Sequence, residues 1–346
     1  MDLETLYNQV AATLAKLDPG RIWPGFEFLR FALFDNEKCY FAGQYVEKTD
    51  AFCANTSIVY NGEQIAIWMV SEELEIPVLT SKIVHEMFHG FQTLRKWDCW
   101  PDEIEALYRY EYNADNLSLK LRENALLSVL SEHPDEAALR ELLSLRRLRS
   151  ERHPYEFSYE LRVEEIEGTA NYVEWQVLKQ LDAQKAAELT ERMRAVMAKP
   201  GQLFPVRISC YYSGALMIHA LLDAGIYPFD PPARPALLPL LKDAVSLDGH
   251  FPGRESCDQA VSGALTAFTE ESESIVRSAL SKNDIVLKGP LGLVYVNIYN
   301  ARCWNGYLTS TYFLMYRDSD GDKMIPGNFV IRMLDEKTID TVYRWE

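Results

Sequence analysis

The chain has 346 residues, a length that suggests about two domains. Of these residues 48% are hydrophobic, 12% aromatic and 25% charged, which is enough apolar material for a sizeable core. A formal net charge of −16 argues against a nucleic-acid partner, because such proteins carry basic patches that meet phosphate. The first residues lack a signal peptide, no run of about 18 apolar residues predicts a membrane span, and six scattered cysteines suit a reducing compartment. We therefore expect a cytoplasmic protein.

The first third of the chain predicts a short helix and a small, mostly antiparallel sheet. An amphipathic helix is expected at residues 4–17. Aromatic and β-branched runs predict strands at residues 26–34, 39–45, 57–60 and 64–70. Asn61-Gly62, between the last two strands, is typical of a tight hairpin turn.

After Pro77 the apolar pattern becomes helical, with Thr80 or Ser81 as a possible helix cap. Further helices are expected at residues 101–131, 135–151, 156–182, 184–198, 211–224, 235–246 and 257–281. The end of the chain predicts strands near residue 286 and at residues 293–298, 306–316 and 329–333. The acidic residues 318–322 lack the complete calcium loop, so we interpret them as a solvated turn.

These elements predict an α+β fold with a small sheet, a large helical part and a β-rich C-terminal unit. The expected division is one domain at residues 1–283, made of a sheet subdomain at 1–78 and a helical part at 79–283. A second, β-rich domain is expected at residues 284–346.

The helix after Pro77 carries His85-Glu86-Met87-Phe88-His89. Residues four apart lie on one face of a helix, so the two imidazoles can bind the same zinc ion. Glu86 can reach water at the ion and act as a general base. The alternative is that both histidines are ordinary core residues, but that explanation gives no reason for Glu86 between them.

A zinc site of this kind needs a third protein ligand, and two glutamates compete for the position. Glu167 precedes Gly168 in a segment that resembles the third-ligand helix of gluzincin peptidases, with Asn171 as a partner that orients His85. Glu111, with Asp115 as its partner, lies in a segment that resembles zinc proteases of the CAAX-processing type. We favour Glu167.

The segment Tyr211-Tyr-Ser-Gly-Ala is similar to a segment of the zinc aminopeptidases whose tyrosine stabilises the oxyanion, and Tyr211 is the matching residue here. The chain thus resembles gluzincin-type zinc metallopeptidases, and His85 to Gln92 matches a segment frequent in poorly characterised bacterial members. No segment for gripping a peptide amino terminus is visible.

The resemblance implies a zincin-like fold and a zinc-dependent hydrolase that cleaves amide bonds of a peptide or protein substrate. His85, His89 and Glu167 would bind Zn²⁺, and Glu86 and Tyr211 would be catalytic. The substrate is expected to lie along an edge strand, at residues 57–60 or 64–70. The alternative hypothesis is a non-catalytic helical binding or scaffold protein that retains a zincin-like metal site.

Overall fold

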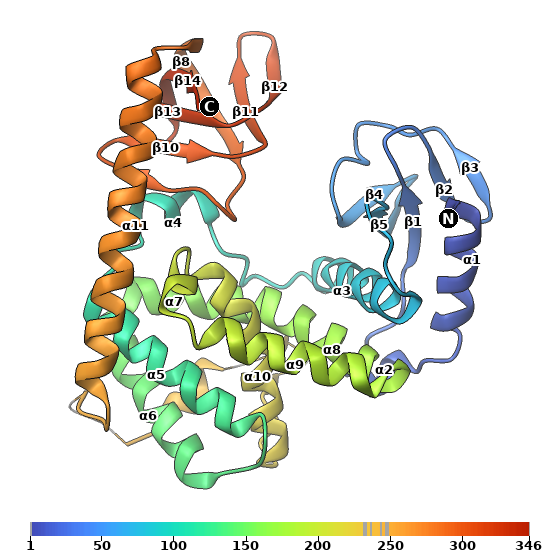
Figure 1. Cartoon of the computed structure of the whole chain (residues 1–346). Helices are drawn as coiled ribbons and strands as arrows, with labels where there is room; N and C mark the ends of the chain where they lie inside the picture. Colours follow the sequence, from blue (N-terminus) through green and yellow to red (C-terminus); the bar gives the residue numbers. More distant parts are fainter. Residues whose placement is uncertain (1, 231–233, 236, 243, 246–248, 346) are drawn as a thin grey trace.

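The computed structural model describes residues 2–230, 234–235, 237–242, 244–245 and 249–345. It has three parts, which are an N-terminal sheet, a central group of helices and a C-terminal sheet (Figure 1). The two sheets stand on the same side of the helices, and a long last helix runs from the helical part to the C-terminal sheet (Figure 1). The predicted α+β fold class is confirmed.

The N-terminal part contains a five-stranded sheet in the order β3-β2-β1-β5-β4. Its elements are α1 (Leu3–Leu14), α2 (Pro19–Ile22), β1 (Arg30–Phe34), β2 (Cys39–Phe41), β3 (Gln44–Val46), β4 (Thr56–Tyr60) and β5 (Glu63–Met69). Only β1 and β5 pair in parallel, so the sheet is mostly antiparallel, as predicted. β4 lies at the edge, whereas β5 lies between β1 and β4.

Two tight turns shape this sheet. Asn61 and Gly62 have φ angles of 50° and 82° and join β4 to β5, which confirms the predicted hairpin. Ala42 and Gly43 have φ angles of 55° and 84° and join β2 to β3. The single strand expected at residues 39–45 was therefore wrong, because the aromatic pattern continues on both sides of a turn.

The helical part follows the N-terminal sheet. Its elements are α3 (Ile76–Leu94), α4 (Glu103–Arg109), α5 (Ala114–Leu130), α6 (Glu136–Arg152), α7 (Pro154–Val163), the π-helical turn η1 (Glu164–Gly168), α8 (Thr169–Leu181), α9 (Ala183–Met197), the 3₁₀ turn η2 (Pro200–Leu203) and α10 (Arg207–Asp223). Apolar side chains from these helices, from α1 and from one face of the N-terminal sheet form the largest core. The opposite face of that sheet has a smaller core of its own.

The start of α3 differs from the expectation. The helix begins at Ile76 rather than near Thr80, and Pro77 lies in its first turn. Proline is tolerated there because the N–H group that it lacks would have no partner within the helix. Thr80 and Ser81 are consequently buried inside the helix rather than capping it.

Two other predicted helices also differ. The helix expected at residues 101–131 is divided into α4 and α5, because Asn113 accepts backbone N–H groups and caps α5. The helix expected at residues 235–246 is not formed in the part of that range that the structure describes. That part contains the end of a two-stranded ribbon of β6 (Phe229–Asp230) and β7 (Arg234–Pro235), and the 3₁₀ turn η3 (Leu238–Leu241). Residues 236, 243 and 246 lie outside the described residues.

The C-terminal part consists of α11 (Arg254–Lys282) and a seven-stranded antiparallel sheet in the order β12-β11-β8-β14-β13-β10-β9. Its strands are β8 (Ile285–Val296), β9 (Cys303–Trp304), β10 (Tyr307–Ser310), β11 (Phe313–Asp318), β12 (Gly321–Pro326), β13 (Phe329–Asp335) and β14 (Thr338–Arg344). The sheet has its own core. α11 packs on the sheet through Val276 and Ala279 and on the helical part through Val261, so it joins the two.

The strand expected at residues 306–316 is interrupted, since β10 and β11 are separate strands on different neighbours. The acidic residues 318–322 lie at the hairpin between β11 and β12, whose turn is Ser319 and Asp320. Lys323 binds the carboxylates of Asp318 and Asp320 there.

Candidate metal centre

α3 carries His85, Glu86 and His89 on the face that lines the main cleft. The helix packs closely on the sheet at Gly90. A Cβ atom at Gly90 would lie 2.3 Å from the side chain of Leu29 and 2.6 Å from Ser57 Oγ. The glycine after His89 therefore lets α3 approach β4, which brings the two histidines beside the edge strand.

Glu167 reaches the same cleft from the π-helical turn η1, between α7 and α8. A π turn inserts one residue into a continuous helix and is frequent at functional sites. The sequence predicted one uninterrupted helix over residues 156–182, so this turn was not foreseen. Its effect is to point Glu167 at the histidines while Glu164, in the same turn, points into the helical core.

η1 and α10 cross with their backbones in contact. A Cβ atom on Gly168 would lie 2.5 Å from Gly214 Cα, and one on Gly214 would lie 2.7 Å from the carbonyl oxygen of Glu164. Only glycine fits both sides of this crossing. Tyr211 lies one turn before Gly214 on α10, so the crossing places the Tyr-x-x-Gly-Ala segment next to the turn that carries Glu167.

His85, His89 and Glu167 form a group that could hold a metal ion, with one ligand atom of each within 4.8 Å of the others. The two Nε2 atoms are 3.1 Å apart. Glu167 Oε2 lies 3.3 Å from His89 Nε2 and 3.8 Å from His85 Nε2. Bonds of about 2.0–2.1 Å to a tetrahedral zinc ion would separate neighbouring ligand atoms by about 3.3 Å. The triangle thus has the size that one such ion requires.

The Nδ1 atom of each imidazole faces an oxygen atom of a second side chain. Gln92 donates its amide to the carbonyl oxygen of Ile166 at 2.8 Å and to Thr169 Oγ1 at 3.0 Å, so its Oε1 faces His89 Nδ1 at 2.8 Å. An oxygen acceptor at this place fixes the proton on Nδ1 and leaves Nε2 free as a ligand.

His85 Nδ1 lies 3.3 Å from Glu174 Oε2, and Glu174 also pairs with Lys82. An oxygen beside each Nδ1 favours a proton on that nitrogen, which leaves the two Nε2 atoms as ligands for one cation. Two imidazole nitrogens and one carboxylate oxygen that converge in this way are the observation that makes these residues fit a metal ion.

The electrostatics of the site favour positive charge. Burial tends to raise the pKa of Glu167, but His89 and Arg207 outweigh it and hold the pKa at about 2, so this carboxylate is ionised. Burial tends to lower the pKa of His89, yet Glu167 and Glu86 raise it to about 9. Burial raises the pKa of Glu86, which makes it a better proton acceptor.

The cleft has a volume of about 980 Å³ and is lined from all three parts of the chain. β4 and the residues just before it contribute one side, α3, η1 and α10 the floor, and the C-terminal sheet the opposite side. This is the size at which small-molecule and peptide segments are accommodated. The C-terminal sheet therefore takes part in the candidate site rather than standing apart from it.

Tyr211 lines this cleft, and its hydroxyl lies 3.0 Å from the hydroxyl of Tyr299, which follows β8. Burial and the carboxylate of Glu167 raise the pKa of Tyr211 well above its usual range, so the phenol stays protonated and can donate. Arg207 donates to Glu167 Oε1 at 2.7 Å and also pairs with Glu103. This contact occupies one oxygen of Glu167 and leaves the other for the histidine side.

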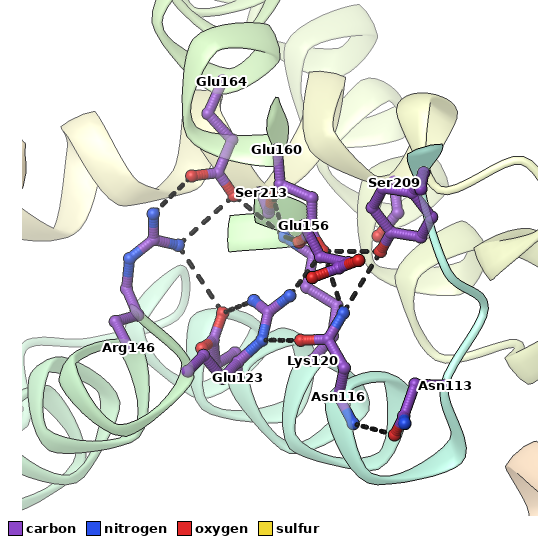
Figure 2. Close-up of polar contacts among 12 residues, drawn as sticks. Asn113, Asn116, Lys120, Glu123, Arg146, Glu156, Glu160, Glu164, Ser209 and Ser213 are labelled. Carbon is purple, nitrogen blue, oxygen red and sulfur yellow. Dashed lines mark hydrogen bonds and ion pairs between the residues drawn. The ribbon is translucent and has the colours of Figure 1, made fainter. Parts of the chain in front are cut away.

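A buried charged cluster surrounds Glu164 of η1 (Figure 2), and none of the residues labelled there lines the cleft. Glu164 accepts Lys120 at 2.8 Å, Arg146 at 2.5 Å and Ser213 at 2.5 Å. Further buried members of the cluster are Asn116, Glu123, Arg149 and Glu160. Arg146 thus pairs with Glu164 and Arg149 with Glu160, and the cluster anchors the turn that carries Glu167.

The competing ligand, Glu111, is exposed and is not part of the metal-binding group. Asp115, its expected partner, binds His153 at 2.8 Å and Arg254 at 2.6 Å instead. Asn171 donates to the carbonyl oxygen of Glu167, and Glu174 takes the place beside His85 that we expected Asn171 to fill.

Sequence reasoning missed Gln92, Glu174, Arg207 and Tyr299 as parts of the site. Gln92 and Glu174 had a visible signal, since both belong to the segments that carried the family resemblance. Arg207 lies one turn before Tyr211, but nothing in the sequence marks its contact with Glu167. Tyr299 had no signal, because only the tertiary structure brings the C-terminal part to the cleft.

Comparison with models of protein families, with curated proteins and with solved structures gives no match for this chain. Among the described residues, no helix has the combination of length and apolar character needed to cross a membrane.

Proposed function

We propose that this protein is a zinc-dependent hydrolase that cleaves peptide bonds, of the gluzincin type that its motifs resemble. The observation that carries the proposal is the triangle of His85 Nε2, His89 Nε2 and Glu167 Oε2, with separations of 3.1, 3.3 and 3.8 Å. Two imidazoles and one carboxylate are a common ligand set of catalytic zinc, which keeps a fourth position open.

The remaining groups support hydrolysis rather than a purely structural ion. A bound zinc ion would supply Lewis-acid chemistry, which polarises a carbonyl group and makes water more acidic. Glu86 lines the same cleft, and it would accept the proton of the attacking water and deliver it to the leaving amine. Tyr211 would donate its hydroxyl to the oxygen on which negative charge develops.

β4 supports a polypeptide substrate. It is an edge strand, so one side of its backbone is available for pairing with an extended chain, and Thr56 and Ser57 line the cleft. The other strand that we considered from the sequence, at residues 64–70, is β5 and lies inside the sheet. We therefore propose β4 as the strand along which the substrate binds.

The test combines metal analysis with turnover of fluorescently labelled unfolded protein. We expect one zinc ion per chain in wild type and in Glu86→Gln. Turnover in Glu86→Gln should fall by about 10²–10⁴-fold, because the general base is lost. Zinc binding without any hydrolysis of wild type would leave the non-catalytic binding protein as the better description.

The third ligand is tested with a matched pair of variants. Glu167→Ala should lose zinc, whereas Glu111→Ala, which changes an exposed glutamate outside the metal-binding group, should keep it. Retention of stoichiometric zinc in Glu167→Ala would refute the proposed ligand set.

A further inference from the structure

The outer face of the C-terminal sheet carries an exposed apolar surface next to the cleft. Met315 on β11 is directly opposite Tyr295 on β8 and Met324 on β12. Phe313 is two residues from Met315 and is opposite Pro326. We call these five residues the apolar ledge.

The ledge lies on the face of the sheet opposite its core. Side chains alternate between the two faces of a strand, and the intervening residues Leu314, Tyr316 and Ile325 pack in the core. The ledge residues remain accessible, with 37% of Tyr295 and 58% of Met324 exposed. The rings of Tyr295 and Phe313 are close to parallel, with an interplanar angle of 9° and centroids 6.5 Å apart.

The ledge is continuous with the candidate active site, because Tyr295 and Phe313 also line the cleft that contains His85 and His89. The edge strand β4 lines the same cleft from the N-terminal sheet. The edge strand and the two aromatic residues of the ledge thus line one cleft. Contiguous exposed apolar surfaces mark interaction sites, and methionine and aromatic side chains adapt to varied partners.

We propose that the apolar ledge is the substrate-selecting surface of this protein and binds the apolar and aromatic side chains of an extended polypeptide. The inference rests on the proposed function, since the bond to be cleaved would lie at His85, His89 and Glu167. It assigns the substrate class as unfolded or extended segments rich in large apolar residues, several residues long.

The test measures binding rather than cleavage. Two labelled peptides of equal length, one with a Phe-Leu-Met centre and one with serines at those positions, are titrated by fluorescence anisotropy into the full chain carrying Glu86→Gln. The ledge variant adds Met315→Ser and Met324→Ser. The matched control adds Leu334→Ser, which changes a 61% exposed side chain of the same sheet.

We expect the apolar peptide to bind more tightly than the serine peptide. The ledge variant should weaken only the apolar peptide, by about tenfold, because two apolar contacts are lost. The Leu334→Ser control should bind both peptides as the parent does. Equal binding of the two peptides, or an unchanged affinity in the ledge variant, would overturn the proposal.

Two further outcomes separate the alternatives. If sedimentation shows that the ledge substitutions turn a dimer into a monomer while peptide affinity is unchanged, the ledge is a contact between two copies and the proposal is wrong. If the ledge effect is found in a protein that holds no zinc, peptide docking stands and the proposed hydrolase fails. If the wild-type protein hydrolyses peptides but peptide affinity is the same with and without the ledge substitutions, the ledge proposal is refuted and the proposed hydrolase stands.

Discussion

Replacing Gly214 with alanine tests whether the close crossing of η1 and α10 builds the candidate site. The new Cβ atom would lie 2.7 Å from the carbonyl oxygen of Glu164 and 2.8 Å from Gly168 Cα. Ordinary contact begins at 3.4 Å. The backbones must therefore separate by roughly 0.7 Å, and overpacking of this kind costs about 1–3 kcal/mol. We expect that loss in the free energy of unfolding, measured by urea denaturation.

The same shift displaces the turn that carries Glu167 from its place beside the histidines, so zinc affinity should also fall, as measured by competition with a chelator. Gly263→Ala is the control, because Gly263 lies within α11 and a Cβ atom there meets nothing within 4 Å. That change should stabilise the protein by about 0.5–1 kcal/mol, since alanine is the better helix former. Wild-type stability and zinc affinity in Gly214→Ala would show that the crossing does not position the site.

Three further changes probe the groups around this turn. Glu164→Ala should lower the free energy of unfolding by about 3–5 kcal/mol, because Lys120 and Arg146 would each lose their nearest carboxylate in a buried environment. A loss below 1 kcal/mol in denaturant titrations would contradict this. Burial tends to raise the pKa of Glu164, but the same two cations outweigh it and hold the pKa below its usual 4.5. The stabilisation by ionised Glu164 is thus complete above pH 4.5 and declines as the pH falls towards the folded-state pKa. The difference in the free energy of unfolding between wild type and Glu164→Ala should therefore shrink in acid. A constant difference from pH 7 to pH 3 would refute the pairing. Gln92→Leu should weaken zinc binding by about 10–100-fold, because the acceptor that orients His89 is lost, and unchanged affinity in chelator competition would show that Gln92 only fills space.

Local sequence patterns predicted the elements that depend on neighbouring residues. The spacing of His85 and His89 on a helix was enough to place both imidazoles on one face. Asn61-Gly62 predicted a hairpin because the turn needs positive φ angles, which these residues adopt readily. Where a turn lacked such a marker, as at Ala42, the expected strand was wrong.

The contacts that complete the site are not local, so the sequence alone could not supply them. Gln92 meets Ile166 across 74 residues of sequence, and Tyr211 meets Tyr299 across 88. Glu167 was chosen over Glu111 only through a resemblance to known peptidases, since both are acidic residues on predicted helices. The structure adds a physical reason, because packing of α3 on α8 brings the start of α8 to the histidines.

The π turn at η1 explains how one short segment serves two environments of opposite character. In an α-helix, residues three apart lie on the same face, so Glu164 and Glu167 would point in similar directions. The wider π turn increases the angle between them. Glu164 can then enter the buried charged cluster (Figure 2), while Glu167 enters the cleft. If Glu164 and Glu167 shared one face of the helix, both carboxylates would lie in the same environment. Either Lys120 and Arg146 or the two histidines would then lack a carboxylate partner. The turn that the sequence did not reveal is thus the feature that lets Glu167 reach the two histidines.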